Sequence, residues 1–583
     1  MGTILLQLAL FLTILTIIAL ALGDYMAKVF KGEKTLLSFI LKPIEKLLYK
    51  LFGVDETTEM DWKAYSFSLI IFNVLGIIAL FALQEVQHLL PFNPQGFGAV
   101  RWDTAINTAV SFVTNTNWQA YGGESTMSYL TQMLGLTVQN FLSAAVGMAV
   151  AVAFIRAFTS TKCPPPQPSP SRGEGVSPTI GNFWVDLTRS IVYILLPLSI
   201  LYSIVFVSQG TIQNLNPYTK VHTIQGVEQI IAQGPVASQE AIKILGTNGG
   251  GFFNANSAHP YENPTAFTDY MQILGLLIIS AAFPFTFGVL LNKRKQGWAI
   301  FSAMMILYLL GLSVALWSEF HGNPILSKLG IQHGLNMEGK EVRFGILNSV
   351  LFGQSTTVTS CGAVNAMHDS FTPLAGMIFM FNMMIGEVIF GGVGSGLVGM
   401  ILYAILTMFL VGLMIGRTPE IFGKKLEPFE MIMAVIALIL PSIIQLIFGA
   451  IASSHNIGLS SLNNAGPHGL SEILYAFASG AGNNGSAFAG LNANTPFYNL
   501  TIAFAMLVGR FATLIPSLAI AGSLIKKRFV PDEAKFPTAS PLFVVMLITV
   551  VIIVGALTFF PALVLGPIIE HLMMVVNAAG GTF

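Results

Sequence analysis

Four short clusters of threonine, asparagine, glycine and serine carry the residues best suited to chemistry in this 583-residue chain. Backbone carbonyls in such clusters can replace the hydration shell of a cation, as they do in potassium filters. Pointing successive carbonyls inward needs backbone angles that glycine adopts without steric cost and asparagine tolerates. The clusters are Thr114–Gln119, Thr247–Phe252, Thr359–Asn365 and Gly482–Phe488. The residues in this role are Gly249, Gly362 and Gly485, with Asn117 in the first cluster.

Any one cluster alone is typical of an ordinary surface turn. Each of the four, however, follows a mixed apolar run of helix length and precedes a full apolar span, which favours a repeated unit of span, short helix, polar loop and span. Irregular backbone survives at membrane depth only when it is buried in protein or lines a watery cavity. The negative C-terminal end of each short helix would face the ion. The predicted short helices are Trp102–Val113, Val236–Leu245, Leu347–Val358 and Leu470–Ser479.

The composition requires a membrane around these elements. Hydrophobic residues make up 54% of the chain and charged residues 10%, whereas soluble domains carry about 25% charged residues. Lys+Arg and Asp+Glu both number 28, so the charge balance gives no indication of nucleic-acid binding. Ten apolar segments are long enough to cross a bilayer. The first, Thr3–Gly23, is predicted to be a retained span because no basic residue precedes it.

Basic residues lie in every second loop, which sets the orientation through the positive-inside bias. The basic loops are Lys28–Lys50, Arg156–Arg172, Lys293–Lys295, Arg417–Lys425 and Lys526–Lys535. This pattern predicts that both termini and all four clusters lie on the extracytoplasmic side. Glu124, Glu262 and Asp369 follow three clusters and would raise the local cation concentration there, although a solvated loop often holds an acid by chance.

The predicted fold class is an all-α polytopic membrane protein with ten transmembrane helices and four pseudo-symmetric units around one pore. Many prolines around 163–175 exclude regular structure there and indicate a disordered cytoplasmic insertion. The predicted segments are a first helix at 1–24, pore repeats at 62–158, 182–292, 297–416 and 427–525, the Pro-rich insertion at 159–181, and a last helix at 538–566.

Two charges fall within apolar segments, Glu387 and Arg510. Charges at membrane depth are costly and mark ion pathways or pairs, so we expect either a role in the ion route or a structural ion pair. A glycine-rich break interrupts the long apolar stretch Phe371–Ile415 and is interpreted as a gate below the filter, with a packing kink as the alternative. Its glycines are Gly391, Gly392, Gly394 and Gly396.

Other motifs carry no predicted chemistry. Gly334–Lys340 matches the start of a phosphate-binding loop, but Glu341 stands where the magnesium-binding Ser or Thr belongs. The nine histidines are scattered without metal-ligand spacing, and Cys163 and Cys361 suggest neither a disulfide framework nor a zinc site. We therefore expect no cofactor and no metal other than potassium, and no intramembrane enzyme, which would need a nucleophile or metal cluster.

The chain closely resembles the KdpA family, the potassium-binding subunits of bacterial Kdp potassium-transporting ATPases. The stretches that carry the resemblance are Thr114–Gln119, Gly246–Pro260, Thr359–Phe371, Gly416–Glu427 and Gly482–Gly490. It implies a potassium-transporter fold, the inner membrane as location, and a lateral tunnel through which the ion reaches the P-type ATPase subunit KdpB.

The resemblance also implies the accessory subunits KdpC and KdpF and membrane lipid as partners. The chain itself lacks the Asp-Lys-Thr-Gly phosphorylation motif and would be a non-catalytic subunit. The alternative is a self-sufficient potassium channel or symporter of the same superfamily. The filter residues carried over are Asn115, Thr116, Gln119, Thr247, Asn248, Gly249, Ser360, Cys361, Gly362, Asn483, Asn484 and Gly485.

Overall fold

The computed structural model describes residues 2–159, 179–331, 335–530 and 536–578. Within them, ten helical segments are long and apolar enough to cross a membrane, which confirms a multi-pass membrane protein. The helices that make up these segments are α1 (Gly2–Lys31), α3 (Trp62–Val86), α6 (Val138–Thr159), α7 (Phe183–Arg189), α8 (Leu196–Ser208), α10 (Ala266–Leu290), α11 (Arg294–His321), α15 (Ser395–Met414), α16 (Pro428–Ser454), α19 (Pro496–Leu524), α20 (Pro541–Leu563) and α21 (Ile569–Ala578). Three π-helical turns continue them, η2 (Thr131–Thr137) before α6, η3 (Ser190–Leu195) between α7 and α8, and η7 (Val564–Ile568) between α20 and α21.

Four shorter helices end inside this bundle, as predicted from the polar clusters. They are α4 (Trp102–Val113), α9 (Val236–Leu245), α13 (Gly345–Val358) and α18 (Gly466–Gly482), and we call them the pore helices. α4 and α9 have the predicted bounds, α13 begins two residues earlier than predicted, and α18 begins four residues earlier and ends three residues later. The long apolar stretch divides into α14 (Pro373–Met384) and α15 around the predicted glycine-rich break.

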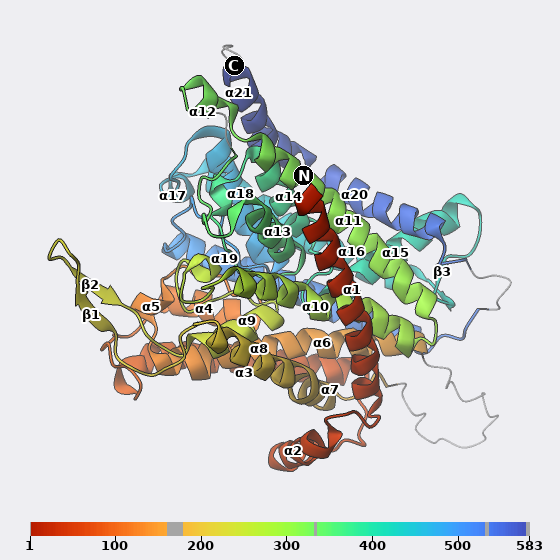
Figure 1. Cartoon of the computed structure of the whole chain (residues 1–583). Helices are drawn as coiled ribbons and strands as arrows, with labels where there is room; N and C mark the ends of the chain where they lie inside the picture. Colours follow the sequence, from red (N-terminus) through yellow and green to blue (C-terminus); the bar gives the residue numbers. More distant parts are fainter. Residues whose placement is uncertain (1, 160–178, 332–334, 531–535, 579–583) are drawn as a thin grey trace, which may run out of the picture.

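The four units close into a ring. The second span of each unit packs against the pore helix of the next: α6 against α9, α10 against α13, α14 against α18, and α19 against α4. Because the last of these contacts joins the fourth unit to the first, the pore helices surround one axis. α1 packs against α10, and α20 against α11 and α15, outside the ring (Figure 1).

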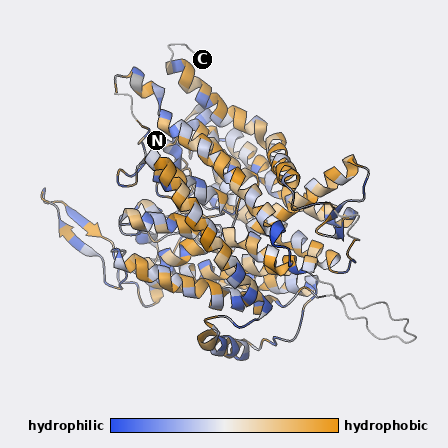
Figure 2. Ribbon diagram, turned by 45° about the vertical axis from the view of Figure 1, so that its right-hand side comes forward, coloured by the Kyte–Doolittle hydropathy of each residue, from blue (hydrophilic) through white to orange (hydrophobic). Residues whose placement is uncertain are grey.

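Burial separates the inner spans from the outer ones. About 89% of the apolar window of the α10 span is buried inside the protein, against 17% for α1 and 28% for α16. Figure 2 shows hydrophobic residues along much of the outward-facing helix surface. The outer helices therefore present much of their apolar surface away from this chain.

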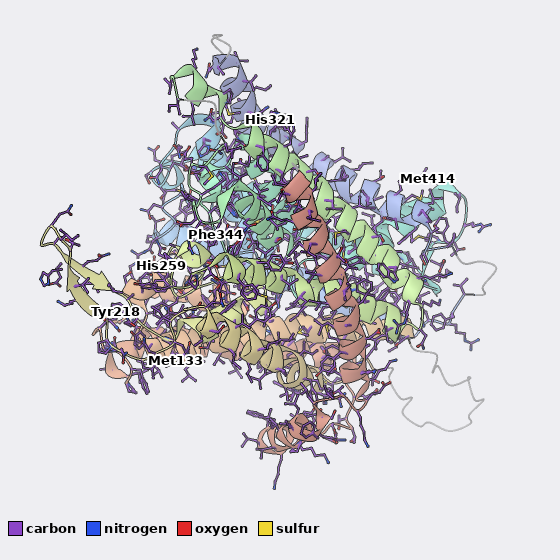
Figure 3. The ribbon with its side chains drawn as sticks, in the orientation of Figure 1. Met133, Tyr218, His259, His321, Phe344 and Met414 are labelled. Atoms are coloured by element: carbon purple, nitrogen blue, oxygen red, sulfur yellow. The ribbon has the colours of Figure 1, made fainter. Side chains whose placement is uncertain are left out.

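Connecting segments gather at two faces. The hairpin of β1 (Thr219–His222) and β2 (Glu228–Ile231) projects from one edge in Figure 1, and we call that side the hairpin face. The strands β3 (Glu420–Ile421) and β4 (Lys424–Lys425) lie at the other edge, on what we call the opposite face. Tyr218 and His259 lie towards the hairpin edge in Figure 3, whereas Met414 lies at the opposite one.

The remaining short elements are η1 (Gln87–Leu89), α5 (Gly123–Thr126), η4 (Asn256–Ala258), α12 (Pro324–Lys328), η5 (His368–Ser370) and α17 (Asn456–Leu459).

The basic loops meet one another at the opposite face. Met60 pairs with Gly181, Lys424 pairs with Phe529, and Arg294 forms an ion pair with Asp24. These contacts bring segments from several of the basic loops, or next to them, together at one face. Two features differ from the expectation: α1 continues to Lys31, and an amphipathic helix, α2 (Ser38–Phe52), follows it. The Pro-rich insertion lies largely outside the described residues.

Candidate ion-binding site

Each pore helix ends in the same backbone motif. The second residue after Val113, Leu245 and Val358, and the first after Gly482, has a left-handed conformation, with φ of 66° at Asn115, 49° at Thr247, 51° at Ser360 and 59° at Asn483. The next N–H donates to the carbonyl five residues back in all four loops, at 2.8–3.2 Å. This is the long hydrogen bond of a Schellman motif, which usually has glycine at the left-handed position. The motif aligns the four loops residue by residue.

The next aligned position forms a ring of Asn117, Gly249, Gly362 and Gly485. All four residues line one cavity of about 470 Å³, which we call the vestibule. A Cβ on Gly249 would collide with the backbone of Gly362, one on Gly362 with Gly485, and one on Gly485 with the Thr116 carbonyl. Glycine is therefore required because the neighbouring loops touch one another through their backbones.

Polar contacts join each loop to the next around the ring. Asn115 Nδ2 donates to the Thr247 carbonyl at 3.0 Å, and Gly362 N–H to the Asn248 carbonyl at 3.3 Å. Asn484 Nδ2 donates to the Thr356 carbonyl at 2.9 Å, and Asn483 Nδ2 to Thr116 Oγ1 at 2.9 Å. Cys361 is fully buried in the third loop, where its carbonyl accepts a hydrogen bond from the Thr356 hydroxyl. The structure thus brings the sequence-predicted loop residues together.

Gln119 lies at the wall of the vestibule. Its side chain exchanges two hydrogen bonds with the backbone of Gly251, donating from Nε2 at 3.0 Å and accepting at Oε1 at 3.0 Å. This reciprocal pair fixes the first loop against the second. His368 lines the same vestibule. Burial, and then the positive charge of Lys340, lower the pKa of His368 to about 3, so its imidazole is neutral and does not repel cations.

A second, smaller cavity of about 50 Å³ lies on the other side of the ring. Its lining includes Ser360 and Asn483 from the loops, with Glu387 and Arg510. The Ser360 hydroxyl donates to Glu387 Oε2, and Arg510 Nη2 donates to the Ser143 carbonyl at 2.8 Å. In the described part of the chain no ion pair joins Glu387 to Arg510, so the structural pair considered from the sequence is not observed.

The glycine-rich break lies directly against the ends of two pore helices. Gly391 N–H donates to the Val358 carbonyl at 2.7 Å, and Val393 N–H donates to Thr247 Oγ1 at 3.2 Å. Left-handed φ angles of 65° at Gly391 and 87° at Gly394 explain the glycines. Gly392 and Gly396 line the smaller cavity.

Sequence reasoning missed a buried ionic cluster behind the second loop. Lys243 Nζ lies 2.7 Å from Glu240 Oε2 and 2.9 Å from Glu262 Oε2, and it donates to Asn256 Oδ1 at 2.9 Å. Asn256 Nδ2 in turn donates to the Gly249 carbonyl at 2.6 Å. Glu262 is therefore not a solvated acid of an outer loop. The signal available in the sequence was the placing of the charged residues Glu240 and Lys243 among apolar residues in Val236–Leu245.

The other two acids near the loops differ from Glu262. Glu124 Oε2 accepts a hydrogen bond from Asn254 N–H at 2.9 Å, and burial raises the pKa of this carboxyl. Asp369 accepts a hydrogen bond from His468 at 2.8 Å. Each acid thus has a specific partner.

Comparison with known proteins places the chain in a well-defined group. The family model KdpA, "Potassium-transporting ATPase A subunit", matches residues 9–572. A potassium-transporting ATPase potassium-binding subunit of Methylorubrum extorquens is 55% identical, with 99% of this chain and 98% of the relative covered. The subunit of the same name from Solibacter usitatus is 54% identical, with 98% of each covered. The crystal structure of the potassium transporter TrkH from Vibrio parahaemolyticus superposes with a TM-score of 0.51 at 15% identity, covering 86% of this chain and 96% of that one, which indicates a shared fold.

Proposed function

The chain belongs to the KdpA family, and from this premise we propose that it is the potassium-binding subunit of an ATP-driven potassium-transporting complex. One observation supports this most: four pore helices with identical Schellman ends converge on one ring between the vestibule and the smaller cavity. The ring presents backbone carbonyls and neutral side chains, which suit a dehydrated monovalent cation.

We assign the filter to the ring and its flanking residues. Potassium enters from the vestibule, loses water to loop carbonyls, and gains from the negative C-terminal ends of four helices. Gly391, Gly392, Gly394 and Gly396 act as a gate because the break contacts the filter from the side of the smaller cavity. The assigned filter residues are Asn115, Thr116, Gln119, Thr247, Asn248, Gly249, Ser360, Cys361, Gly362, Asn483, Asn484 and Gly485.

Arg510 and Glu387 belong to the ion route in this proposal. Both line the smaller cavity, and a fixed positive charge at Arg510 opposes a straight passage to the opposite face. The ion instead leaves sideways, towards a P-type ATPase subunit of the KdpB type, with KdpC and KdpF as accessory subunits. We place the complex in the bacterial inner membrane, with both termini on the extracytoplasmic side because the basic loops gather at the opposite face.

Transport by proteoliposomes tests the assignment against a self-sufficient channel or symporter. We expect the chain alone to pass no potassium and the complex with its ATPase subunit to accumulate potassium only with ATP. Potassium flux through the isolated chain would support the alternative.

The coupling role of Arg510 has a separate test. Arg510→Met should leave the complex assembled but reduce the potassium transported per ATP hydrolysed, through leak. An assembled variant with wild-type stoichiometry and no leak would rule out this role.

A further inference from the structure

A cluster of three carboxylates and one histidine lies beside the filter, between the third and fourth units. Asp369 lies in η5, His468 and Glu472 are one turn apart on α18, and Glu570 lies on α21. One ligand atom of each of Asp369, His468 and Glu472 lies within 4.8 Å of the other two. We propose that these three residues bind a divalent transition-metal ion, for which zinc fits the donors best.

Both ring nitrogens of His468 hydrogen bond with carboxylates in the structure, so a metal ion would take the place of the proton between Nε2 and Asp369. His468 Nε2 faces Asp369 Oδ1 at 2.8 Å, and His468 Nδ1 lies 2.7 Å from Glu570 Oε1. A carboxylate on the second ring nitrogen orients the imidazole and raises its basicity as a ligand. Glu570 is thus the supporting residue and not a ligand.

Glu472 supplies the second, independent observation. Its side chain is fully buried, and Oε1 accepts a hydrogen bond from Asn464 Nδ2 at 2.7 Å. Its other oxygen, Oε2, is buried with no hydrogen-bond partner among the described residues. A buried carboxylate oxygen without a partner carries a desolvation cost that a bound cation removes.

The backbone of Gly490 lies directly against two of these carboxylates. A Cβ at Gly490 would collide with Glu472 Oε1 and would lie 2.8 Å from Asp369 Oδ1. Glycine at this position therefore lets the two carboxylates approach each other. Access comes from a cavity of about 420 Å³ whose lining includes Asp369, His468 and Glu570.

The donor set selects the class of metal. Magnesium and calcium prefer oxygen ligands alone, whereas zinc accepts imidazole and carboxylate together, with ligand distances of about 2.0–2.2 Å. Three carboxylates against one histidine also leave an excess of negative charge for a divalent ion to balance. A water molecule completes the coordination in this assignment.

The ion would join three elements around the filter. Asp369 N–H donates at 2.7 Å to the carbonyl of Phe488, the last residue of the fourth polar cluster. His468 and Glu472 belong to the fourth pore helix, and Glu570 ties α21 to them. Zinc would therefore brace the surroundings of the filter from outside, without entering the path of the transported ion.

Zinc binding by the full chain in its purified, detergent-solubilised assembly tests the proposal. After chelator treatment and dialysis against zinc in saturating potassium, we expect one zinc per chain and a higher thermal midpoint. His468→Gln and Glu472→Gln should lose both effects, and Glu570→Gln should weaken zinc binding by about 10- to 100-fold. Glu338→Gln is the matched control, because Glu338 lines the same cavity outside the cluster.

Three outcomes would overturn the proposal: no stoichiometric zinc on the wild-type chain, undiminished zinc in the ligand variants, or displacement of zinc by potassium. Should His468→Gln or Glu472→Gln fail to assemble, the wild-type stoichiometry and the Glu570→Gln affinity still decide. None of these readouts depends on transport, so the proposed function stands or fails separately.

Discussion

Among the described residues with a left-handed backbone, Thr247 is the β-branched one. A β-branched residue rarely takes a left-handed conformation, and the penalty for a side chain there is roughly 1–2 kcal/mol. Its hydroxyl accepts the N–H of Val393 in the glycine-rich break at 3.2 Å. Strain of this kind persists at functional sites when the surrounding structure holds it. We infer that the Thr247 hydroxyl holds the proposed filter against the glycine-rich break.

Thr247→Gly should therefore separate stability from function. Glycine relieves the left-handed strain, so we expect the free energy of unfolding to rise or to stay within about 1 kcal/mol of wild type. The apparent potassium affinity in ATPase assays should fall because the contact with Val393 is lost. A matched change at Gly53, Gly53→Ala, places a side chain at an exposed left-handed residue and should leave that affinity unchanged. Wild-type affinity in Thr247→Gly would contradict the role of the hydroxyl.

Gly249→Ser tests the ring itself. The new Cβ would collide with the backbone of Gly362, and φ at Gly249 is 95°, so the second and third loops must move apart. We expect weaker discrimination between potassium and rubidium or ammonium, measured as cation-stimulated ATP hydrolysis by the reconstituted complex. Gly98→Ser is the control, because a Cβ at Gly98 meets open space. An unchanged selectivity profile in Gly249→Ser would contradict the assignment of the ring to the filter.

At the scale of elements, α2 shows how a short amphipathic helix is held at the opposite face. Leu41, Glu45 and Tyr49 face the protein, while Phe39 and Leu47 are exposed. Glu45 Oε1 accepts from Arg189 at 3.0 Å and from Tyr49 at 2.8 Å, and Oε2 accepts from Tyr193 at 2.8 Å. The exposed apolar residues and the lysines between them suit the membrane interface.

The docking of α2 should weaken at acid pH. Burial alone would raise the pKa of Glu45, but the hydrogen bonds from Tyr193, Tyr49 and Arg189 outweigh it and hold the pKa below its ordinary value of 4.5. A carboxyl with a lowered pKa stabilises the folded state fully above its ordinary value, and this contribution is lost as the pH falls through the lowered pKa. A spin label at Leu47→Cys should therefore gain mobility only below pH 4.5. In Glu45→Gln the mobility should not change with pH; a pH response there would assign the effect to another group.

The sequence predicted the long and periodic elements best. The spans and all four pore helices followed from apolar length and from the polar clusters, because a membrane leaves few choices for backbone hydrogen bonds. α2 was missed because its lysines were interpreted as a loop, and the hairpin was missed because Thr219–His222 and Glu228–Ile231 are half polar and depend on pairing with each other. Side-chain partners were the least predictable, as Glu262 shows. Its pairing with Lys243 depends on how the loop after α9 turns back.

At the scale of the whole molecule, the basic loops lie at the opposite face and the sparsely basic loops lie on the side of the hairpin face. Arg294 and Asp24 pair at the opposite face, whereas Arg101 contacts Asn494 on the side of the hairpin face. The proposed orientation follows from this separation and from the positive-inside bias.

Cysteine labelling checks this orientation. In a background without Cys163 and Cys361, Ile224→Cys at the fully exposed hairpin tip should react with an impermeant thiol reagent on intact cells. Lys293→Cys, exposed at the opposite face, should react only after the cells are opened. Labelling of Lys293→Cys alone on intact cells would invert the proposed topology.

The candidate filter was recognised in the sequence as four clusters, and the structure agrees with the predicted alignment of Asn117 with Gly249, Gly362 and Gly485, but the starts of the clusters are not in register. Counting from the cluster starts places Thr114 beside Thr247, whereas the shared hydrogen bond aligns Asn115 with Thr247. That offset depends on where each helix ends, which a single sequence defines only to within a few residues. The proposed metal-binding cluster was equally hidden, since Asp369 lies far from His468 and Glu472 in the chain.

One polypeptide supplies all four Schellman ends, so a mutation changes one loop at a time. In a pore of four identical subunits, every mutation enters the filter four times at once. Here Asn115, Thr247, Ser360 and Asn483 occupy the left-handed position of the same backbone motif. A single codon change therefore alters only one of the four loops of the proposed filter, so its properties can be adjusted in small steps.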